Sequence, residues 1–269
     1  MTEAPSILTR LRRVLGRVPG VLRLRRGAYA RAFASHENVN LYRGVFDTFE
    51  QAALSAPNTK PPGYDNEASA RMYDDVMEPT LRDYPAMFWL QRAFLDGHER
   101  VFDLGGHVGI KYYAFSGRMQ MPTQLRWRVC DVPAVVARGN ALAIEKGTAE
   151  TLRFTADWRD LSAADVLFAS GSIQYLPVSL GDMLRALPTR PARLVINSAA
   201  LHPTRSFFTL NSIGVSFCPY RVQSEPSFMD DMNALGYRCV DRWETPRDFA
   251  IPFEPGYEMD RFVGLAFTR

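Results

Sequence analysis

Short apolar runs alternate with helix-like segments from residue 100 onward. Such runs predict strands that are buried on both faces, as in a parallel sheet with crossover helices. They lie at 100–104, 126–130, 152–155, 166–169 and 193–196. A helix at 226–235 and two strands, at 238–243 and 262–267, complete the pattern. We therefore expect an α/β fold with a seven-stranded, mostly parallel sheet and an antiparallel terminal strand.

The residues before this region carry helical periodicity instead. Helices are predicted at 7–18, 66–77 and 84–95, and in the first of these apolar residues recur every three or four positions. The first of these is amphipathic, and Pro19-Gly20 is expected to break it. A turn at 41–46 precedes a further helix start, for which Asp47 or Thr48 is the predicted cap.

The basic residues are concentrated at the N-terminus. Residues 1–31 hold eight arginines and one acidic residue, so they carry +7 and the rest carries −4 of the net +3. This basic helix can lie on an anionic membrane surface, or pack on its own domain or a second subunit. We expect residues 1–98 to form an N-terminal helical segment for covering, docking or oligomerisation, and residues 99–269 to form the α/β domain.

Composition narrows the class of protein. With 46% hydrophobic and 12% aromatic residues, the chain of 269 residues can bury a real core. It has no apolar run near the roughly 20 residues of a membrane span and no signal-peptide pattern, so we expect a soluble, cytoplasmic protein. The three cysteines and four histidines lack ligand spacing, which predicts no metal site.

A glycine-rich turn directly follows the first predicted strand. It reads Asp103-Leu104-Gly105-Gly106-His107-Val108-Gly109. Glycines at a strand-to-helix turn let the backbone approach a ligand, so we predict cofactor binding by Asp103, Gly105, Gly106, His107 and Gly109. His107 departs from the dinucleotide pattern, and Asp103 would repel a diphosphate but tolerate the cationic groups of S-adenosylmethionine (SAM). For His107, orientation of the SAM carboxylate and simple packing both stay open.

The ends of the next two strands supply further candidates. Asp131, followed by Val132, stands where a nucleotide-binding sheet presents a carboxylate to two ribose hydroxyls. Asp157 and Trp158 follow the third strand. They either contact the adenine ring or form a helix cap and a core residue, and the sequence does not decide between these readings.

The fourth and fifth strands point to the transfer site. Ser170 and Gly171 end the fourth strand and should border the cofactor, and Gln174 and Tyr175 should border the transferred group, although Tyr175 can instead pack. His202, just past the fifth strand, is the candidate base, with a capping role as the alternative. Other possible acceptor contacts are Tyr112, Tyr113, Asn197, Arg205, Asn211, Tyr220 and Arg221.

Five short stretches carry a resemblance to a known family. They are Tyr42-Arg43-Gly44-Val45-Phe46-Asp47, Tyr84-Pro85, Phe102-Asp103-Leu104-Gly105-Gly106, Leu125-Arg126-Trp127 and Ser172-Ile173-Gln174-Tyr175-Leu176. From about Tyr42 to Trp243 the chain resembles bacterial class I SAM-dependent methyltransferases, often encoded near polysaccharide or secondary-metabolite clusters. The resemblance implies a Rossmann-like domain with SAM as cofactor.

The departures from that family are also informative. The family has a small residue where this chain has His107, and commonly Glu where it has Asp131. Asp131-Val132-Pro133 is instead similar to the Asp-Leu-Pro of many small-molecule O-methyltransferases. Residues 197–221, where the methyl acceptor should be chosen, are less similar, so the resemblance implies donor and fold but not substrate.

We therefore predict methyl transfer from SAM to a small-molecule acceptor, with oxygen as the expected methylated atom. One alternative is a catalytically degenerate methyltransferase fold that acts as a binding protein or scaffold. Another is an NAD-dependent oxidoreductase, against which His107 and Asp103 count. No nucleic-acid partner is expected because the excess of positive charge lies outside the predicted domain. A homodimer and a weak membrane-surface contact through residues 1–31 stay open.

Overall fold

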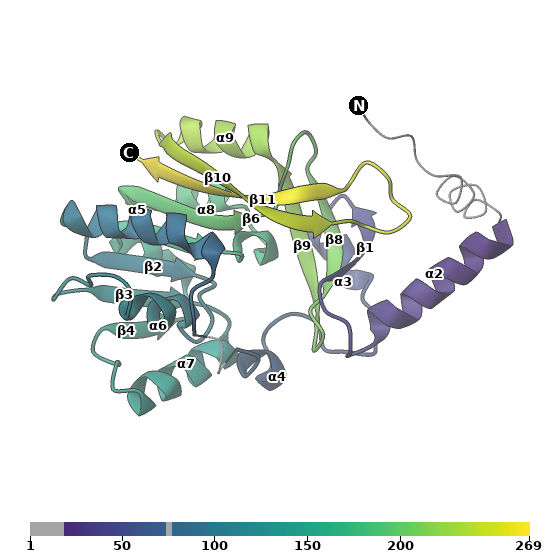
Figure 1. Ribbon diagram of the computed structural model, residues 1–269, viewed down its shortest axis with the longest axis horizontal. Coiled ribbons are helices and arrows are strands. Elements are labelled where there is room, and N and C mark those ends of the chain that lie inside the picture. Colours follow the sequence, from purple (N-terminus) through teal and green to yellow (C-terminus); the bar gives the residue numbers. More distant parts are fainter. Residues whose placement is uncertain (1–18, 74–76) are drawn as a thin grey trace.

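The central feature of the fold is a seven-stranded sheet with the order β10-β11-β6-β5-β2-β3-β4 (Figure 1). The computed structural model describes residues 19–73 and 77–269. The strands of this sheet are β2 (Arg100–Leu104), β3 (Arg126–Cys130), β4 (Leu152–Thr155), β5 (Val166–Ser170), β6 (Arg193–Ala199), β10 (Arg238–Phe249) and β11 (Met259–Thr268).

The predicted fold class is confirmed. Neighbouring strands from β4 to β6 are parallel, whereas β11 pairs antiparallel with both β6 and β10. The last strand of the chain is therefore the antiparallel one, inserted beside the edge strand. The strands β2, β3 and β4 have the predicted bounds, while β5, β6, β10 and β11 are longer than predicted.

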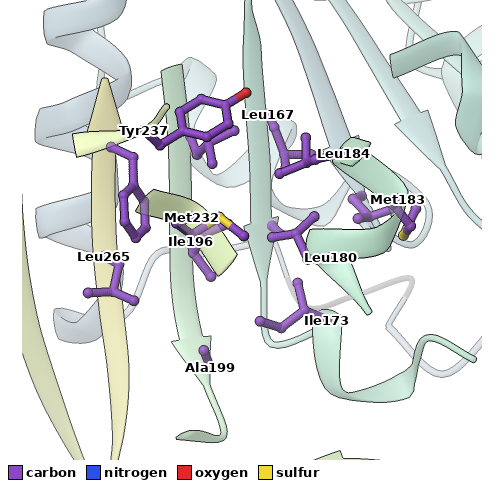
Figure 2. Packing of buried hydrophobic residues seen from close by; sticks show 14 of the residues in the cluster. Leu167, Ile173, Leu180, Met183, Leu184, Ile196, Ala199, Met232, Tyr237 and Leu265 are labelled. Atoms are coloured by element: carbon purple, nitrogen blue, oxygen red, sulfur yellow. The ribbon is translucent and has the colours of Figure 1, made fainter. Parts of the chain in front are cut away.

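Helices cover both faces of this sheet, which explains why its strands are apolar throughout. One face packs against α5 (Tyr84–Leu95), α6 (Ile110–Ser116) and α7 (Pro133–Glu145). The other packs against α8 (Leu180–Ala186) and α9 (Glu225–Ala234). Figure 2 shows this second core, in which Leu180 and Met183 of α8 and Met232 of α9 meet side chains of the sheet such as Ile196.

Strand order creates a switch point at the carboxyl ends of β2 and β5. The chain runs outward from β2 to β3 and β4, and then returns to place β5 on the other side of β2. The loops that follow β2 and β5 therefore leave in opposite directions. In open α/β sheets, ligands bind in the crevice outside the strands at such a point.

A second sheet, which the sequence did not predict, stands beyond the carboxyl ends of the parallel strands (Figure 1). Its order is β1-β8-β9-β7, formed by β1 (Leu41–Phe46), β8 (Phe207–Ser212), β9 (Phe217–Ser224) and β7 (Leu201–His202). The turn predicted at 41–46 is wrong, because this segment pairs antiparallel with β8. We call these four strands the second sheet. The N-terminal segment predicted as helical thus also contributes a strand.

The described part of the N-terminal segment also holds helices. They are α2 (Pro19–Ala34), α3 (Phe49–Leu54) and α4 (Glu67–Ala70), together with the 3₁₀ helix η1 (Leu81–Asp83). Pro19 begins α2 where a break was predicted, because proline suits the first helical position. Thr48 caps α3 as predicted. The predicted helix 7–18 lies outside the described residues.

Two further observations concern these helices. The helix predicted at 66–77 is shorter than expected, because α4 ends at Ala70 and only 71–73 and 77 of the following residues are described. Among the helices of residues 19–73 and 77–269, none combines the length and the apolar character that a bilayer-spanning helix needs.

Candidate functional site

The glycine-rich turn lies at the switch point, directly after β2. Gly105 and Gly109 have φ values of +71° and +89°, and His107 also has a positive φ, 55°. A Cβ on Gly105 would lie 2.4 Å from the Cβ of Ser172, and one on Gly106 would lie 2.4 Å from the carboxyl carbon of Asp103. Backbone conformation and close packing within the protein thus require these glycines, whether or not a ligand approaches the turn as predicted.

Asp103 is the buried charge of this turn. Its side chain lies on the α5 and α6 face of the sheet and is 1% exposed. One carboxylate oxygen accepts a hydrogen bond from Trp127 Nε1 at 3.1 Å, whereas Oδ1 has no hydrogen-bond partner within the described residues. Burial raises the pKa of Asp103 to about 7. A buried carboxylate with one free oxygen is suited to a cationic hydrogen-bond donor.

Asp131 stands one strand away, directly after β3. Its two carboxylate oxygens accept hydrogen bonds from the backbone N–H groups of His107, at 2.9 Å, and Val132, at 2.8 Å. Burial raises the pKa of Asp131, and these N–H groups and the charge of His107 act against that rise. The carboxylate is therefore fixed in orientation, and each oxygen retains a lone pair for a ligand hydroxyl.

Asp157 and Trp158 are placed differently. Asp157 is exposed and caps the 3₁₀ helix η2 (Trp158–Ala163), accepting from the backbone N–H of Arg159 at 3.0 Å. The guanidinium of Arg159 also lies over the Trp158 ring, 5.2 Å from its centroid. Trp158 itself packs against the core beneath α8 and α9. These contacts are those of the alternative reading, a helix cap and a core-packed ring.

The segment after β5 closes the other side of the switch point. The Gly171 N–H donates to the Asn197 carbonyl at 2.8 Å, and the Ser172 hydroxyl donates to the carbonyl of Leu104, which ties this segment to the glycine-rich turn. Ser170 accepts from Asn197 Nδ2 at 3.2 Å. The predicted residues Ser170 and Gly171 are thus brought together with the turn.

Gln174 and Tyr175 follow in the 3₁₀ helix η3 (Ile173–Tyr175). Gln174 is buried, and the Tyr175 hydroxyl donates to Asn211 Oδ1 of β8 at 2.9 Å. Burial raises the pKa of Tyr175 well above its usual value, so its phenol stays protonated at neutral pH. Tyr175 also contacts Tyr220 edge to face, with ring centroids 5.0 Å apart. These contacts join η3 to the second sheet.

His202 lies in β7, where its own turn holds it. Its Nδ1 accepts the backbone N–H groups of Thr204 at 3.1 Å and Arg205 at 3.0 Å. Burial, and secondarily the charge of Arg205, lower the pKa of His202, so the imidazole is neutral at pH 7. The residues on either side of it, Leu201 and Pro203, line an open groove of about 590 Å³ between the end of β10 and the start of β11.

This groove is separate from the glycine-rich turn. Its remaining lining residues are Asp248, Phe249, Ala250, Glu258, Met259, Asp260 and Arg261. The three carboxylates among them are exposed to solvent. None of these carboxylates is buried with an oxygen that lacks a hydrogen-bond partner, as Asp103 Oδ1 does among the described residues. We therefore assign the candidate site to the turn and not to the groove.

A segment that the sequence did not flag covers the turn. We call residues 63–73, which include α4, the roof segment. The Ser69 carbonyl oxygen lies 2.9 Å from His107 Nε2. The Tyr73 ring contacts the His107 ring edge to face, with ring centroids 5.0 Å apart. At its other end, Tyr64 contacts Tyr175 at 5.5 Å. Figure 1 shows α4 between α7 and the second sheet.

A buried polar network follows the glycine-rich turn. Lys111, in the first turn of α6, donates to both carboxylate oxygens of Asp83 at 2.8 Å. Asn197 donates to Asp83 at 3.2 Å and accepts from Trp243 Nε1 at 3.1 Å. Asp83 is fully buried, so this network ties the N-terminal segment to the ends of the strands. The sequence signal that could have indicated this network is Lys111, a lysine two residues after the glycine-rich turn.

Comparison with protein-family models gave no match, and comparison with curated protein sequences gave none either. Solved structures do resemble the fold. One is the 1,6-didemethyltoxoflavin-N1-methyltransferase of Burkholderia thailandensis with bound S-adenosylhomocysteine. It is 20% identical over 75% of this chain and 84% of that chain, with a TM-score of 0.48.

Two more matches show how wide the likeness is. Geranyl diphosphate C-methyltransferase from Streptomyces coelicolor A3(2) is 14% identical over 89% of this chain and 96% of that one, with a TM-score of 0.49. The [4+2]-cyclase SpnF is 14% identical over 78% and 98%, with a TM-score of 0.46. Likeness of this extent concerns the fold alone, so cofactor and reaction have to be argued from the site.

Proposed function

We propose that this chain is a SAM-dependent methyltransferase acting on a small molecule. The observation that carries the proposal is the Asp103 carboxylate, which is buried at the switch point with one oxygen lacking a partner in the described residues. A diphosphate would be repelled there, whereas the ammonium group of SAM would be attracted. Asp131, held by two backbone N–H groups one strand away, supports the same cofactor.

The residues of the site fit SAM in their chemistry. When bound, SAM supplies a methyl group on a sulfonium, which an acceptor takes in an in-line displacement. Asp103 would hold the ammonium group, and Asp131 would accept hydrogen bonds from the ribose hydroxyls. Gly105 and Gly106 keep side chains out of the turn. The roof segment covers the turn, which limits the access of water.

The acceptor side is less determined by the residues. Tyr175 and Gln174 join the switch point to the second sheet, so the acceptor is proposed to bind between the switch point and that sheet. Because Tyr175 is protonated, it can donate a hydrogen bond but does not act as a base. We keep oxygen as the proposed methylated atom, on the likeness of Asp131-Val132-Pro133 to small-molecule O-methyltransferases. His202, the base predicted from the sequence, adjoins the separate groove and not the glycine-rich turn; loss of the acidic limb of the pH–rate profile in His202→Ala would identify it as the base and bring the groove into the site.

Titration calorimetry tests the cofactor directly. The intact protein should bind SAM and S-adenosylhomocysteine saturably, and Asp103→Asn should weaken SAM binding at least tenfold, because the amide carries no charge. The matched control is Asp260→Asn, which removes an exposed carboxylate from the separate groove and should leave affinity unchanged. Absence of SAM binding to the intact protein, or saturable NAD binding, would overturn the proposal.

A second experiment separates an enzyme from a scaffold of the same fold. Labelled SAM is incubated with the protein and a broad pool of small metabolites. Transfer of label to a small molecule, which Asp131→Ala abolishes, is expected of a methyltransferase. Tight SAM binding without any transfer would favour the scaffold.

We also propose that α2 contacts an anionic membrane surface. The helix carries Arg23, Arg25, Arg26 and Arg31 and no acidic residue, and Leu24 is 75% exposed. Each arginine near an anionic bilayer contributes about 1 kcal/mol. Reversing Arg23 and Arg31 to Glu should abolish flotation with phosphatidylserine vesicles, whereas Arg153→Glu on the body should not. A homodimer stays a prediction.

A further inference from the structure

His107 joins three parts of the molecule that are distant in sequence. Its backbone N–H donates to Asp131 at 2.9 Å, its Nε2 lies 2.9 Å from the Ser69 carbonyl, and its ring meets Tyr73 edge to face. Because a carbonyl oxygen can only accept, Nε2 must carry the proton and donate. The imidazole is 6% exposed, so these contacts are made away from bulk water.

The backbone at His107 adopts a conformation that is unfavourable for a residue with a side chain. His107 has a φ of 55°, a left-handed conformation that glycine adopts at lower energy. Two neighbours in the turn, Gly105 and Gly109, also have positive φ and are glycines. A histidine in such a conformation persists where surrounding contacts compensate for the strain, and strained residues concentrate at functional sites.

The roof segment is anchored independently at the second sheet. Asn66 Nδ2 donates to Ser216 Oγ at 3.0 Å, and the hydroxyls of Ser69 and Ser216 lie 3.2 Å apart. The Gly63 N–H donates to the Phe217 carbonyl at 2.8 Å. On the other side, the Ala134 N–H donates to Asp65 at the start of α7. The roof segment meets the glycine-rich turn through the contacts of Ser69 and Tyr73 with His107 and through a buried cluster that Ala70 shares with Val108.

We propose that His107 is a positioning residue that holds the roof segment closed against the glycine-rich turn and orients the Asp131 carboxylate. It acts through Ser69 and Asp131 and takes no part in the chemical step. The consequence for a bound ligand is slow release, since the roof segment must separate from the turn before the ligand leaves. This consequence rests on the proposed cofactor, whereas the structural role does not.

Hydrogen–deuterium exchange of the protein without ligand tests the structural role. His107→Gly removes the imidazole and suits the positive φ, so amides of the roof segment should exchange roughly tenfold faster, as expected for loss of one hydrogen bond. His107→Gln, whose side-chain amide can donate at a similar reach, should restore much of the protection. His36→Ala, which removes an exposed histidine, should change nothing.

Stopped-flow dissociation of S-adenosylhomocysteine tests the functional consequence. We expect roughly tenfold faster dissociation from His107→Gly with an association rate within about twofold of the parent, and recovery in His107→Gln. A Ser216→Ala variant, which loosens the opposite end of the roof segment, gives a second readout if His107→Gly folds poorly. It should also speed both exchange and dissociation.

The outcomes distinguish the two proposals. Failure of the parent protein to bind the ligand would overturn the proposed cofactor, and the exchange result would still judge the role of His107. Parent-like exchange and parent-like dissociation in a folded His107→Gly would overturn the positioning role. Equally fast ligand dissociation from His107→Gly and His107→Gln, with parent-like amide exchange in the roof segment of both variants, would also overturn it.

Discussion

The ends of three strands in the same sheet place an aspartate in two different environments. Asp103, in β2, is buried, and Asp131, directly after β3, is fixed by backbone N–H groups; β2 and β3 each have a neighbouring strand on both sides. Asp157 follows β4, the edge strand, and is an exposed helix cap. An edge strand has a neighbour on only one side, so less of the protein packs over its end. The same residue after the same kind of strand thus becomes a site or a cap according to its place in the sheet.

The pH dependence of stability should show the largest contrast. The folded protein keeps a proton on Asp103 up to a pKa of about 7, whereas the unfolded chain loses it near 3.8, the usual pKa of an exposed aspartate. The folded state therefore binds more protons between these values, and stability falls as pH rises through this window, by on the order of 4 kcal/mol at most, and is flat above it.

Chemical unfolding of the parent and Asp103→Asn from pH 4.5 to 8 measures this effect. The variant should lack most of the decline and be the more stable protein at pH 8. Asp157 has the opposite sign, since hydrogen bonds to Arg159 lower its pKa, so its small contribution is present above the unfolded pKa and lost on acidification. A parent profile without decline between pH 4.5 and 7 would contradict the burial argument.

Ligand affinity should show the next largest contrast. Asp131→Ala removes two fixed acceptor atoms and should weaken S-adenosylhomocysteine binding about 100-fold, as expected for two charge-assisted hydrogen bonds. Asp157→Ala removes an exposed cap and should change the affinity by no more than about twofold. Calorimetry on both variants decides the matter, and a large loss in Asp157→Ala would restore that residue to the cofactor site.

Proton release on binding is the smallest expected effect and the most specific. At pH 7, near the pKa of Asp103, about half of the molecules carry a proton on this carboxyl. An ammonium group bound beside it favours the ionised form, so SAM binding should release roughly 0.5 proton. Calorimetry in buffers of different ionisation enthalpy measures this number, which should fall to near zero in Asp103→Asn and stay unchanged in Asp157→Asn.

The local pattern of the sequence determined a large part of this protein. The strands β2, β3 and β4, the helix α5 and the Thr48 cap were predictable because apolar runs, periodicity and capping act over a few residues. The glycine-rich turn was predictable for the same reason, since only glycine readily takes the positive φ at positions 105 and 109. These features also sufficed to predict the fold class and the candidate cofactor.

Only the tertiary structure decided how distant segments meet. β1 pairs with β8, so that Leu41 lies opposite Ser212, and residues 63–73 come to cover a turn that begins some thirty residues later. Such pairings depend on long-range packing, which a single sequence does not encode in any local pattern. The difference between Asp103 and Asp157 has the same origin, because burial depends on what the rest of the chain places over each strand end.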